Sequence, residues 1–175
     1  MAPATIGAIG DTLGYEAFEL TTESNAALYR KHATELTQYA TMLVGPDDAA
    51  DVVANAVLSC MSSRSWQGVA NPRAYLFRAT QREAHRVSRS RWRRRSAEER
   101  AGPLSAVDPP SVRDTDITSA LQRLSLRQRG IVYLTYWEDR SPQQIAALLG
   151  ISEGAIKRHL ARARAQLREV LDDHR

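Results

Sequence analysis

Two short predicted helices near the C-terminus, each with clear start or stop signals, constrain the fold of this chain more than any other feature. Ser141-Pro142-Gln143-Gln144 is typical of a helix start, with a capping serine, a proline at the first helical position and a glutamine suited to a capping box. Gly150 ends that helix after about two turns, and Ser152 begins another helix almost at once. Two helices joined by a three-residue turn that contains glycine predict a helix-turn-helix.

The second of these helices has two faces of opposite chemistry. Its apolar residues recur at intervals of four, three and four and are Ile156, Leu160, Ala163 and Leu167. The opposite face carries small and basic residues, so a duplex can approach the backbone while arginines reach phosphates and guanine edges. The residues that we expect to bind duplex DNA are Ser152, Glu153, Gly154, Ala155, Lys157, Arg158, Ala161 and Arg162. The alternative is an ordinary amphipathic helix with a basic solvent face, and the short glycine-terminated helix before it argues against that.

Upstream, arginines recur along one side of a helix predicted over residues 72–95. They are Arg78, Arg82, Arg86, Arg89 and Arg93, spaced four, four, three and four residues apart. A cationic stripe of this kind gains from counterion release when it binds a polyanion. Trp92 lies inside the block and Trp66 lies upstream of it, and aromatic rings beside arginines stack on unpaired bases. The alternatives are a solvated charged surface for the arginines and packing within the domain for the aromatic rings.

Helical periodicity also dominates the rest of the chain, and no segment shows the sustained alternation of a strand. We therefore predict an all-α fold of two small helical domains joined by a proline-containing linker, with the helix-turn-helix in the C-terminal domain. The expected parts are an N-terminal arm at 1–22, a helical domain at 23–95, a linker at 96–115 and the helix-turn-helix domain at 116–175. Gly102-Pro103 and Asp108-Pro109-Pro110 indicate that the linker is stiff and non-helical.

Charge is distributed unevenly along the chain, although its net value is only +4. Residues 1–71 carry 3 basic and 8 acidic side chains, residues 72–100 carry 10 and 3, and residues 101–175 carry 11 and 9. An acidic front followed by an arginine block predicts two partner surfaces of opposite sign. The single cysteine, Cys60, fits a reducing, cytosolic setting as a buried apolar residue. No run of about 18 apolar residues occurs, so we expect no membrane span.

An enzyme is a third possibility, and it finds little support. The histidines are scattered at His32, His85, His159 and His174, and neither metal-ligand spacing nor a nucleophile–base motif appears. We therefore expect no catalytic residue, no metal and no cofactor. The paired Asp47 and Asp48 fit the start of a helix, where the helix dipole favours negative charge.

Several segments together resemble the extracytoplasmic-function sigma factors of the sigma-70 family. Residues 28–32, 39–45 and 48–53, followed by Asn71-Pro72-Arg73-Ala74-Tyr75-Leu76-Phe77-Arg78, are similar to the second conserved region of that family. Residues 124–129 and 162–168, together with Leu149-Gly150-Ile151-Ser152-Glu153-Gly154-Ala155-Ile156-Lys157, are similar to its fourth region. The resemblance covers about residues 24–171 and is stronger in the C-terminal half.

The resemblance implies a cytoplasmic two-domain protein that binds RNA polymerase core and directs it to promoter DNA. It places core docking, on the coiled coil of the largest polymerase subunit, at Asp48, Asp51, Val52, Asn55 and Leu58. It places opening of the minus-ten element at Trp66, Arg78, Arg82, His85, Arg86, Arg89, Trp92 and Arg93. The helix from Ser152 would read the minus-35 element. Further implied partners are the flap of the second-largest subunit and an anti-sigma protein, with no membrane partner.

Several positions depart from the family pattern, and the later positions of the docking helix, Ala54, Asn55 and Val57, lack the glutamine, glutamate and aromatic residue that are usual there. Ala50 replaces the usual glutamate of the docking helix, and Arg82 stands where the melting helix often has asparagine. These changes suggest the hypothesis of weakened core docking and an unusual promoter preference. The alternative function is a helix-turn-helix regulator that binds duplex DNA without acting as a sigma factor. The arginine helix and the two-domain layout favour the sigma factor.

Overall fold

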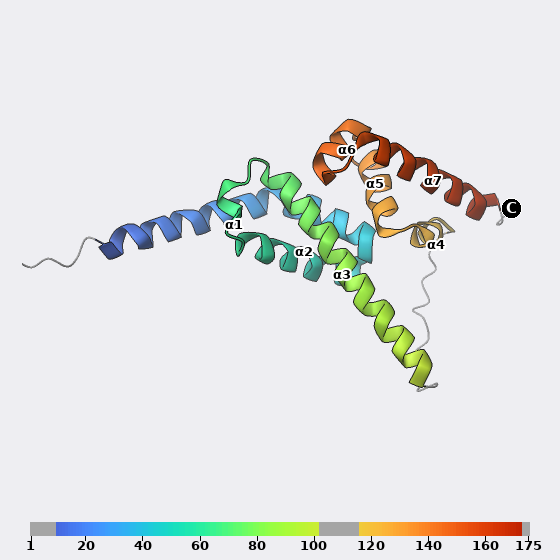
Figure 1. The fold of residues 1–175 in the computed structure, drawn as a ribbon, viewed down its shortest axis with the longest axis horizontal. Helices are drawn as coiled ribbons and strands as arrows, with labels where there is room; N and C mark the ends of the chain where they lie inside the picture. The colour runs from blue at the N-terminus through green and yellow to red at the C-terminus, as the bar shows by residue number, and fades with distance from the viewer. Residues whose placement is uncertain (1–9, 102–115, 173–175) are drawn as a thin grey trace, which may run out of the picture. The chain divides into compact units, whose positions relative to one another are not determined.

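The computed structural model of the chain describes residues 10–101 and 116–172 (Figure 1). These residues form α helices and one 3-10 helix, with no strand among them, which confirms the all-α prediction. The elements are α1 (Gly10–Val44), α2 (Pro46–Met61), a 3-10 turn (Trp66–Gly68), α3 (Pro72–Ala101), α4 (Asp116–Arg123), α5 (Leu126–Tyr136), α6 (Pro142–Leu149) and α7 (Glu153–Asp172). None of the described helices is both long and apolar enough to cross a bilayer.

Two helices are longer than the sequence predicted. α1 begins at Gly10, so the described part of the expected arm is helical, and α3 continues to Ala101, beyond the expected start of the linker. Helix growth is cooperative, because each residue added to a formed helix gains a hydrogen bond, and the extension of α3 over residues 96–101 consists mainly of Ala and Glu. The Gly102-Pro103 and Asp108-Pro109-Pro110 signals lie outside the described residues. By compactness the chain divides into residues 1–34 and 35–175, and the second unit holds both predicted DNA-binding helices.

The first apolar core of this unit lies between α2, α3 and the last part of α1. α2 buries an apolar stripe that consists of Val52, Val53, Ala56, Val57 and Cys60. Opposite it, Leu76 and Phe77 of α3 are fully buried, and the Phe77 ring lies 5.0 Å from that of Tyr39. Asn71 caps α3 as predicted, because its Oδ1 accepts a hydrogen bond of 3.0 Å from the backbone N–H of Ala74. The cap sets where α3 begins, and the buried stripe of α2 sets which face of α3 packs inward.

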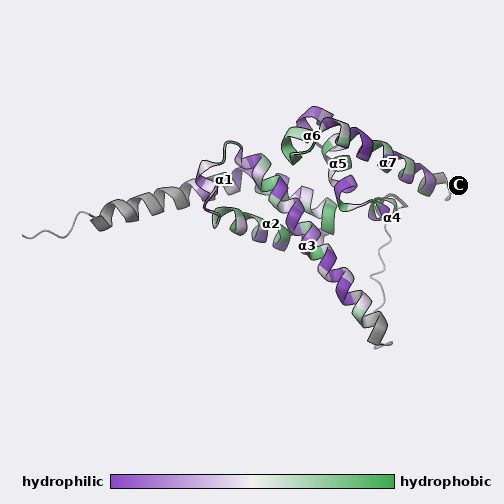
Figure 2. Ribbon diagram, viewed as in Figure 1, coloured by the Kyte–Doolittle hydropathy of each residue, from purple (hydrophilic) through white to green (hydrophobic). Residues whose placement is uncertain are grey.

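The second core joins α5, α6 and α7. Both α5 and α6 begin with a complete capping box, formed by Ser125 with Gln128 and by Ser141 with Gln144. Gly150 ends α6 in the left-handed region, at φ 69° and ψ 38°, as the sequence predicted. Fully buried apolar residues fill the space between these helices, and α7 shows a hydrophobic stripe within an otherwise hydrophilic surface (Figure 2). The caps and the glycine turn set the start and end of each helix of the helix-turn-helix.

The turn between α5 and α6 contains a strained residue. Asp139 has φ 47°, and it is the one non-glycine residue with positive φ in the described part of the chain. We expect Asp139→Gly to stabilise the protein by about 0.5–1 kcal/mol, because glycine adopts this conformation without a Cβ clash. Urea unfolding measures the change. Asp139→Ala keeps the Cβ and should bring no gain, so equal stability of the two variants would contradict the strain.

Candidate nucleic-acid interface

The outer face of α7 is exposed as the sequence predicted. Gly154, Arg158, Ala161, Arg162 and Ala165 are all exposed, while the apolar stripe on the other side is buried except for the half-buried Leu167. Upstream, the Ser152 hydroxyl accepts a hydrogen bond of 3.2 Å from the backbone N–H of Ala155 and so caps the helix. A helix with small residues and cations on its open side can lie in a major groove.

Two of the predicted recognition residues contact each other. Lys157 Nζ lies 2.7 Å from Glu153 Oε1, and a hydrogen bond from Lys157 holds the pKa of the Glu153 carboxyl below its usual range. By contrast, neither Arg158 nor Arg162 forms an ion pair with any residue that the structure describes. These two guanidinium groups are therefore the cations most available to bases and phosphates on α7.

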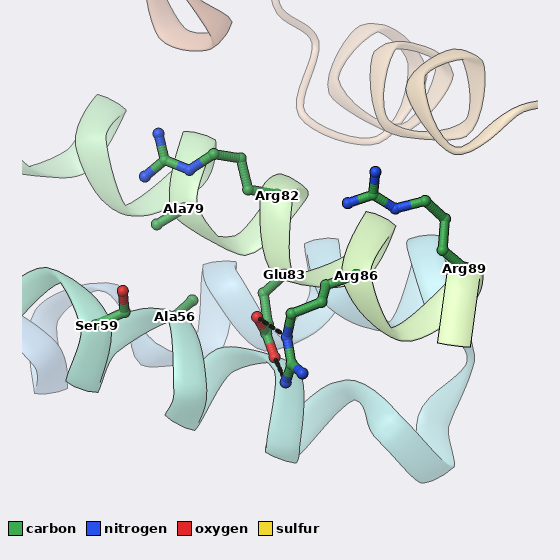
Figure 3. A pocket seen from close by; sticks show the side chains of 7 residues that line it. All are labelled: Ala56, Ser59, Ala79, Arg82, Glu83, Arg86 and Arg89. Carbon is green, nitrogen blue, oxygen red and sulfur yellow. Dashed lines mark hydrogen bonds and ion pairs between the residues drawn. The ribbon is translucent and has the colours of Figure 1, made fainter. Parts of the chain in front are cut away.

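A second cationic surface lies on α3. Three of its arginines line a pocket of about 200 Å³ between α2 and α3, whose lining is Ala56, Ser59, Ala79, Arg82, Glu83, Arg86 and Arg89 (Figure 3). Arg86 folds onto Glu83 with hydrogen bonds of 2.8 and 2.5 Å, which raises the pKa of its guanidinium. Arg82 and Arg89 instead extend to the same side, away from α2 (Figure 3). The site therefore presents two guanidinium groups without an ion pair among the described residues, of which that of Arg82 lies 5.9 Å from the centre of the Tyr75 ring, beside one that is neutralised.

The start of the predicted stripe differs from its middle. Arg78 is half-buried, its Nε donates to the carbonyl of Ala74 at 3.1 Å, and its side chain lies against Gly150. A Cβ at Gly150 would approach Arg78 Nη1 to 2.8 Å, which the flexible end of the arginine could relieve, so it is the positive φ of 69° that favours glycine here. Arg78 thus belongs to a packing contact rather than to the exposed stripe.

The aromatic and histidine residues of the predicted minus-ten site differ in how far their side chains are exposed. Trp66 is only 7% exposed and its ring packs 5.9 Å from Tyr75, whereas Trp92 is 70% exposed and Arg93 is exposed beside it. Burying a whole indole stabilises the fold more than leaving it for a ligand, which explains why Trp66 lies inside. His85 is half-buried, and burial followed by the charges of Arg127 and Arg89 lowers its pKa.

Sequence reasoning gave Arg127 of α5 no DNA-contacting role, although it lies near both surfaces. Burial lowers the pKa of His159 on α7, and the Arg127 charge lowers it further, as it also does for His85 on α3. One cation therefore adds positive potential to helices from both halves of the chain. Its place depends on tertiary packing, and no local sequence signal could have revealed it.

Some of the expected core-docking residues on α2 are exposed, and others are buried or half-buried. Asp51, Asn55 and Leu58 are exposed at helical spacing, and Leu58 is 62% exposed. Val52 is fully buried, and the half-buried Asp48 forms an ion pair with Arg91 of α3. An exposed leucine between polar residues is what a protein-binding helix face needs. Within the residues that the structure covers, no three His, Cys, Asp or Glu side chains gather as metal ligands.

Comparison with protein families and curated proteins supplies independent findings. Residues 114–167 match the family model described as Sigma-70, region 4. The chain is 34% identical over 136 residues to the RNA polymerase sigma-E factor of Streptomyces avermitilis, a match that covers 73% of each protein. It is 32% identical over 161 residues to the ECF RNA polymerase sigma factor SigL of Mycobacterium tuberculosis, covering 84% of this chain and 88% of the relative.

The fold of the chain also resembles that of solved structures. The chain resembles the sigma factor RpoE of Bartonella quintana, solved in complex with the anti-sigma factor NepR, with a TM-score of 0.62 and 25% identity over 86% of this chain and 98% of the other. It also resembles CnrH, solved in complex with the cytosolic domain of CnrY, with a TM-score of 0.59 and 25% identity over 87% of this chain and 90% of the other.

Proposed function

Because this chain belongs to the extracytoplasmic-function sigma factors of RNA polymerase, we propose that its two cationic helices divide the promoter between them. As a sigma factor it binds RNA polymerase and promoter DNA and directs transcription initiation. In our proposal, α7 reads the minus-35 element and α3 opens and holds the minus-ten element. The observation that carries this division is the presence, on each of these two helices, of exposed arginines that form no ion pair with another described residue.

On α7, the chemistry favours readout of duplex DNA. Arg158 and Arg162 are four residues apart and exposed, so both guanidinium groups face the same groove. An arginine can donate two parallel hydrogen bonds to guanine O6 and N7, the commonest specific contact in the major groove. Gly154, Ala155 and Ala161 add little bulk and let the helix approach the base edges.

On α3, the chemistry favours separated strands. Arg82 and Arg89 would hold backbone phosphates, and the exposed Trp92 would stack on an unpaired base. His85, Arg86 and Arg93 complete this proposed surface. We leave out Trp66 and Arg78, because the first is buried and the second packs against Gly150.

The proposed polymerase contacts lie elsewhere. The exposed face of Asp51, Asn55 and Leu58 would dock on the coiled coil of the largest subunit, and the helix-turn-helix domain would bind the flap of the second-largest subunit. Since Asp48 pairs with Arg91 and Ala50 lacks a carboxylate, we propose that core docking is weaker than is usual in the family. Equal core affinity of this chain and an ordinary family member would remove that idea.

Regulation and organisation complete the proposal. The similar sigma factor RpoE is solved in complex with the anti-sigma factor NepR, so we propose an anti-sigma partner for this chain as well. We further propose residues 23–95 and 116–175 as its two domains, a cytoplasmic location and action without catalysis of its own. The alternative of a DNA-binding regulator outside the sigma factors is not favoured, because the matches to sigma factors cover 73–84% of this chain and so extend into both of its halves.

Run-off transcription tests the proposed function. Purified core polymerase with this chain should produce a discrete transcript from promoters selected in a genomic library, and core alone should not. The mechanism requires both helices, so Arg82→Gln with Arg89→Gln should abolish the transcript while leaving binding to a minus-35 duplex intact. If the wild-type chain binds the minus-35 duplex but yields no transcript from any promoter, or if the double variant transcribes as well as the wild type, the division of the promoter between α3 and α7 is wrong.

A further inference from the structure

The position of Arg127 on α5 follows from the packing of its neighbour Gly130. Arg127 precedes Gly130 by three residues, so the two share a face of the helix. Gly130 lies directly on the Tyr39 ring, because a Cβ there would come within 2.6 Å of the Tyr39 hydroxyl. That ring lies 5.0 Å from the ring of Phe77 on α3, and α3 and α5 are in contact. Arg127 therefore lies on the side of α5 that faces α3.

Residues of α3 continue this side of the helix toward solvent. The residues that recur there at intervals of four are Phe77, Gln81, His85 and Arg89. Exposure rises along this row from the buried Phe77 to the exposed Arg89, and His85 is half-buried between them. Burial lowers the pKa of the His85 imidazole, and the charges of Arg127 and Arg89 lower it further. Both guanidinium groups therefore lie near His85.

The third helix of this cationic cluster is α7, which packs on α5. Its His159 is half-buried. Burial lowers the pKa of this imidazole, and the charges of Arg127, Arg162 and Arg158 lower it further. Arg127 is thus the common neighbour of two imidazoles, one on α3 and one on α7. Every charged side chain that shifts the pKa of His85 or His159 is an arginine.

The polar groups around Arg127 are donors that lack an acceptor. Arg127 is half-buried, yet it forms neither an ion pair nor a hydrogen bond with any residue that the structure describes. The Tyr39 hydroxyl and Gln81 Nε2 are buried, and neither has a hydrogen-bond partner among the same residues. Taking a cation partly out of water without a counter-charge costs free energy, and a bound anion would recover it.

Acidic side chains on α3 and α7 are paired with other cations. Glu83 holds Arg86 on the side of α3 that faces α2 (Figure 3), and Glu153 holds Lys157 in the first turns of α7. No described carboxylate contributes to the pKa shift of either imidazole beside Arg127. Cations that gather without a carboxylate oppose folding, and a cluster of this kind is typical of a site that binds an anion.

We propose that Arg127 is the centre of a phosphate-binding site shared by α3, α5 and α7, and that Arg89 and Arg162 flank it. A guanidinium group donates two parallel N–H groups to one phosphate, which suits Arg127 to the central role. The phosphate belongs either to a free polyphosphate or to the backbone of a nucleic-acid strand, because both present the same oxygens. The site goes beyond the proposed division of the promoter and does not rest on it, because its central residue belongs to neither of those surfaces.

Calorimetric titration of the full chain with inorganic pyrophosphate tests the site directly. Arg127→Gln should weaken binding roughly tenfold or more at constant ionic strength, because charge-assisted hydrogen bonds to the anion are lost. Arg168→Gln is the matched control, since it removes an exposed arginine of α7 that lies nine residues, or about 14 Å, beyond His159. This control should bind like the wild type. Equal weakening in both variants would mean a general attraction to cations and would refute the site.

Urea unfolding separates a binding cation from a structural one. Because Arg127 has no partner among the described residues, Arg127→Gln should be at least as stable as the wild type in phosphate-free buffer. Pyrophosphate should raise the unfolding midpoint of the wild type, since a ligand that binds only the folded state stabilises it, and should raise that of the variant far less. A variant that is less stable without the ligand, and stabilised by it as much as the wild type, makes Arg127 a structural residue and overturns the proposal.

Histidine NMR locates the bound anion. Pyrophosphate added at constant pH should move the imidazole signals of both His85 and His159, and the movement should be lost in Arg127→Gln. If calorimetry detects binding but neither signal moves, the anion binds elsewhere, and the site at Arg127 is refuted.

A nucleic-acid ligand identifies where the phosphate comes from. Single-stranded oligonucleotides of about twelve nucleotides present a row of phosphates at a length typical of strand-binding sites. If the strand competes with pyrophosphate and Arg127→Gln binds it more weakly, the site holds a nucleic-acid backbone. If strand binding is the same in both proteins while pyrophosphate binding falls, the site holds a free polyphosphate. If Arg127→Gln binds both ligands as the wild type does, there is no phosphate site at Arg127.

Discussion

Replacing Arg158 and Arg162 together with alanine should weaken binding to the minus-35 duplex by at least about 30-fold. Both side chains are exposed on the open face of α7 and form no ion pair with any described residue. Each base-reading arginine is worth roughly 1–3 kcal/mol, so the pair should cost about 2–6 kcal/mol, or roughly 30- to 20,000-fold in affinity. Titration of a labelled duplex at fixed salt concentration measures this loss.

A control with the same charge change separates base readout from general attraction. Arg123→Ala with Arg164→Ala also removes two exposed cations from the second half of the chain. The guanidinium of Arg164 donates to the Tyr136 hydroxyl at 2.8 Å and lies off the recognition face. The control should lose only the weak, salt-dependent part of the affinity. If both double variants bind equally well, α7 does not read sequence through these arginines.

Phe77→Ala should be the most destabilising single change in the first core. The Phe77 side chain is fully buried, its ring lies 5.0 Å from Tyr39, and the Arg73 guanidinium lies 4.9 Å from the ring centre. Removing a buried phenylalanine costs about 3–5 kcal/mol, a large part of the roughly 5–15 kcal/mol by which domains are stable. The midpoint of urea unfolding should fall accordingly.

Leu58→Ala is the matched comparison, because it truncates an apolar side chain that is 62% exposed. Its stability should stay within about 0.5 kcal/mol of the wild type, as is usual for surface changes. Affinity for polymerase core should nevertheless fall, since Leu58 is the apolar centre of the proposed docking face. A Leu58→Ala chain with reduced stability and normal core affinity would place Leu58 in the fold rather than in the docking surface.

Local signals in the sequence predicted the helix ends and the two faces of α7. A serine with glutamine three residues on specifies a capping box through neighbouring backbone groups alone, and both such pairs form one. Gly150 likewise ends α6 through its own left-handed conformation. The buried stripe of α2 followed from periodicity, because any soluble helix must cover its apolar side.

The sequence could not reveal contacts between residues far apart in the chain. The stripe from Arg78 to Arg93 looks continuous on a helical net, yet Arg78 packs on Gly150, more than seventy residues away. In the same way Asp48 meets Arg91, and Trp66 turns inward onto Tyr75. Spacing states which residues share a face of a helix, but only packing decides whether that face meets solvent or another helix.

The reactivity of the single cysteine, Cys60, reports on the packing of α2 against α3. Cys60 is 2% exposed, and burial raises the pKa of its thiol to about 11. At neutral pH about one thiol in ten thousand is then ionised, and only the thiolate reacts readily with oxidants and alkylating reagents. Oxidative signals therefore reach this residue only when α2 leaves its place. The rate at which an alkylating reagent labels the Cys60 thiol therefore reports how often α2 opens locally. Because Cys60 is the single cysteine, no probe needs to be introduced.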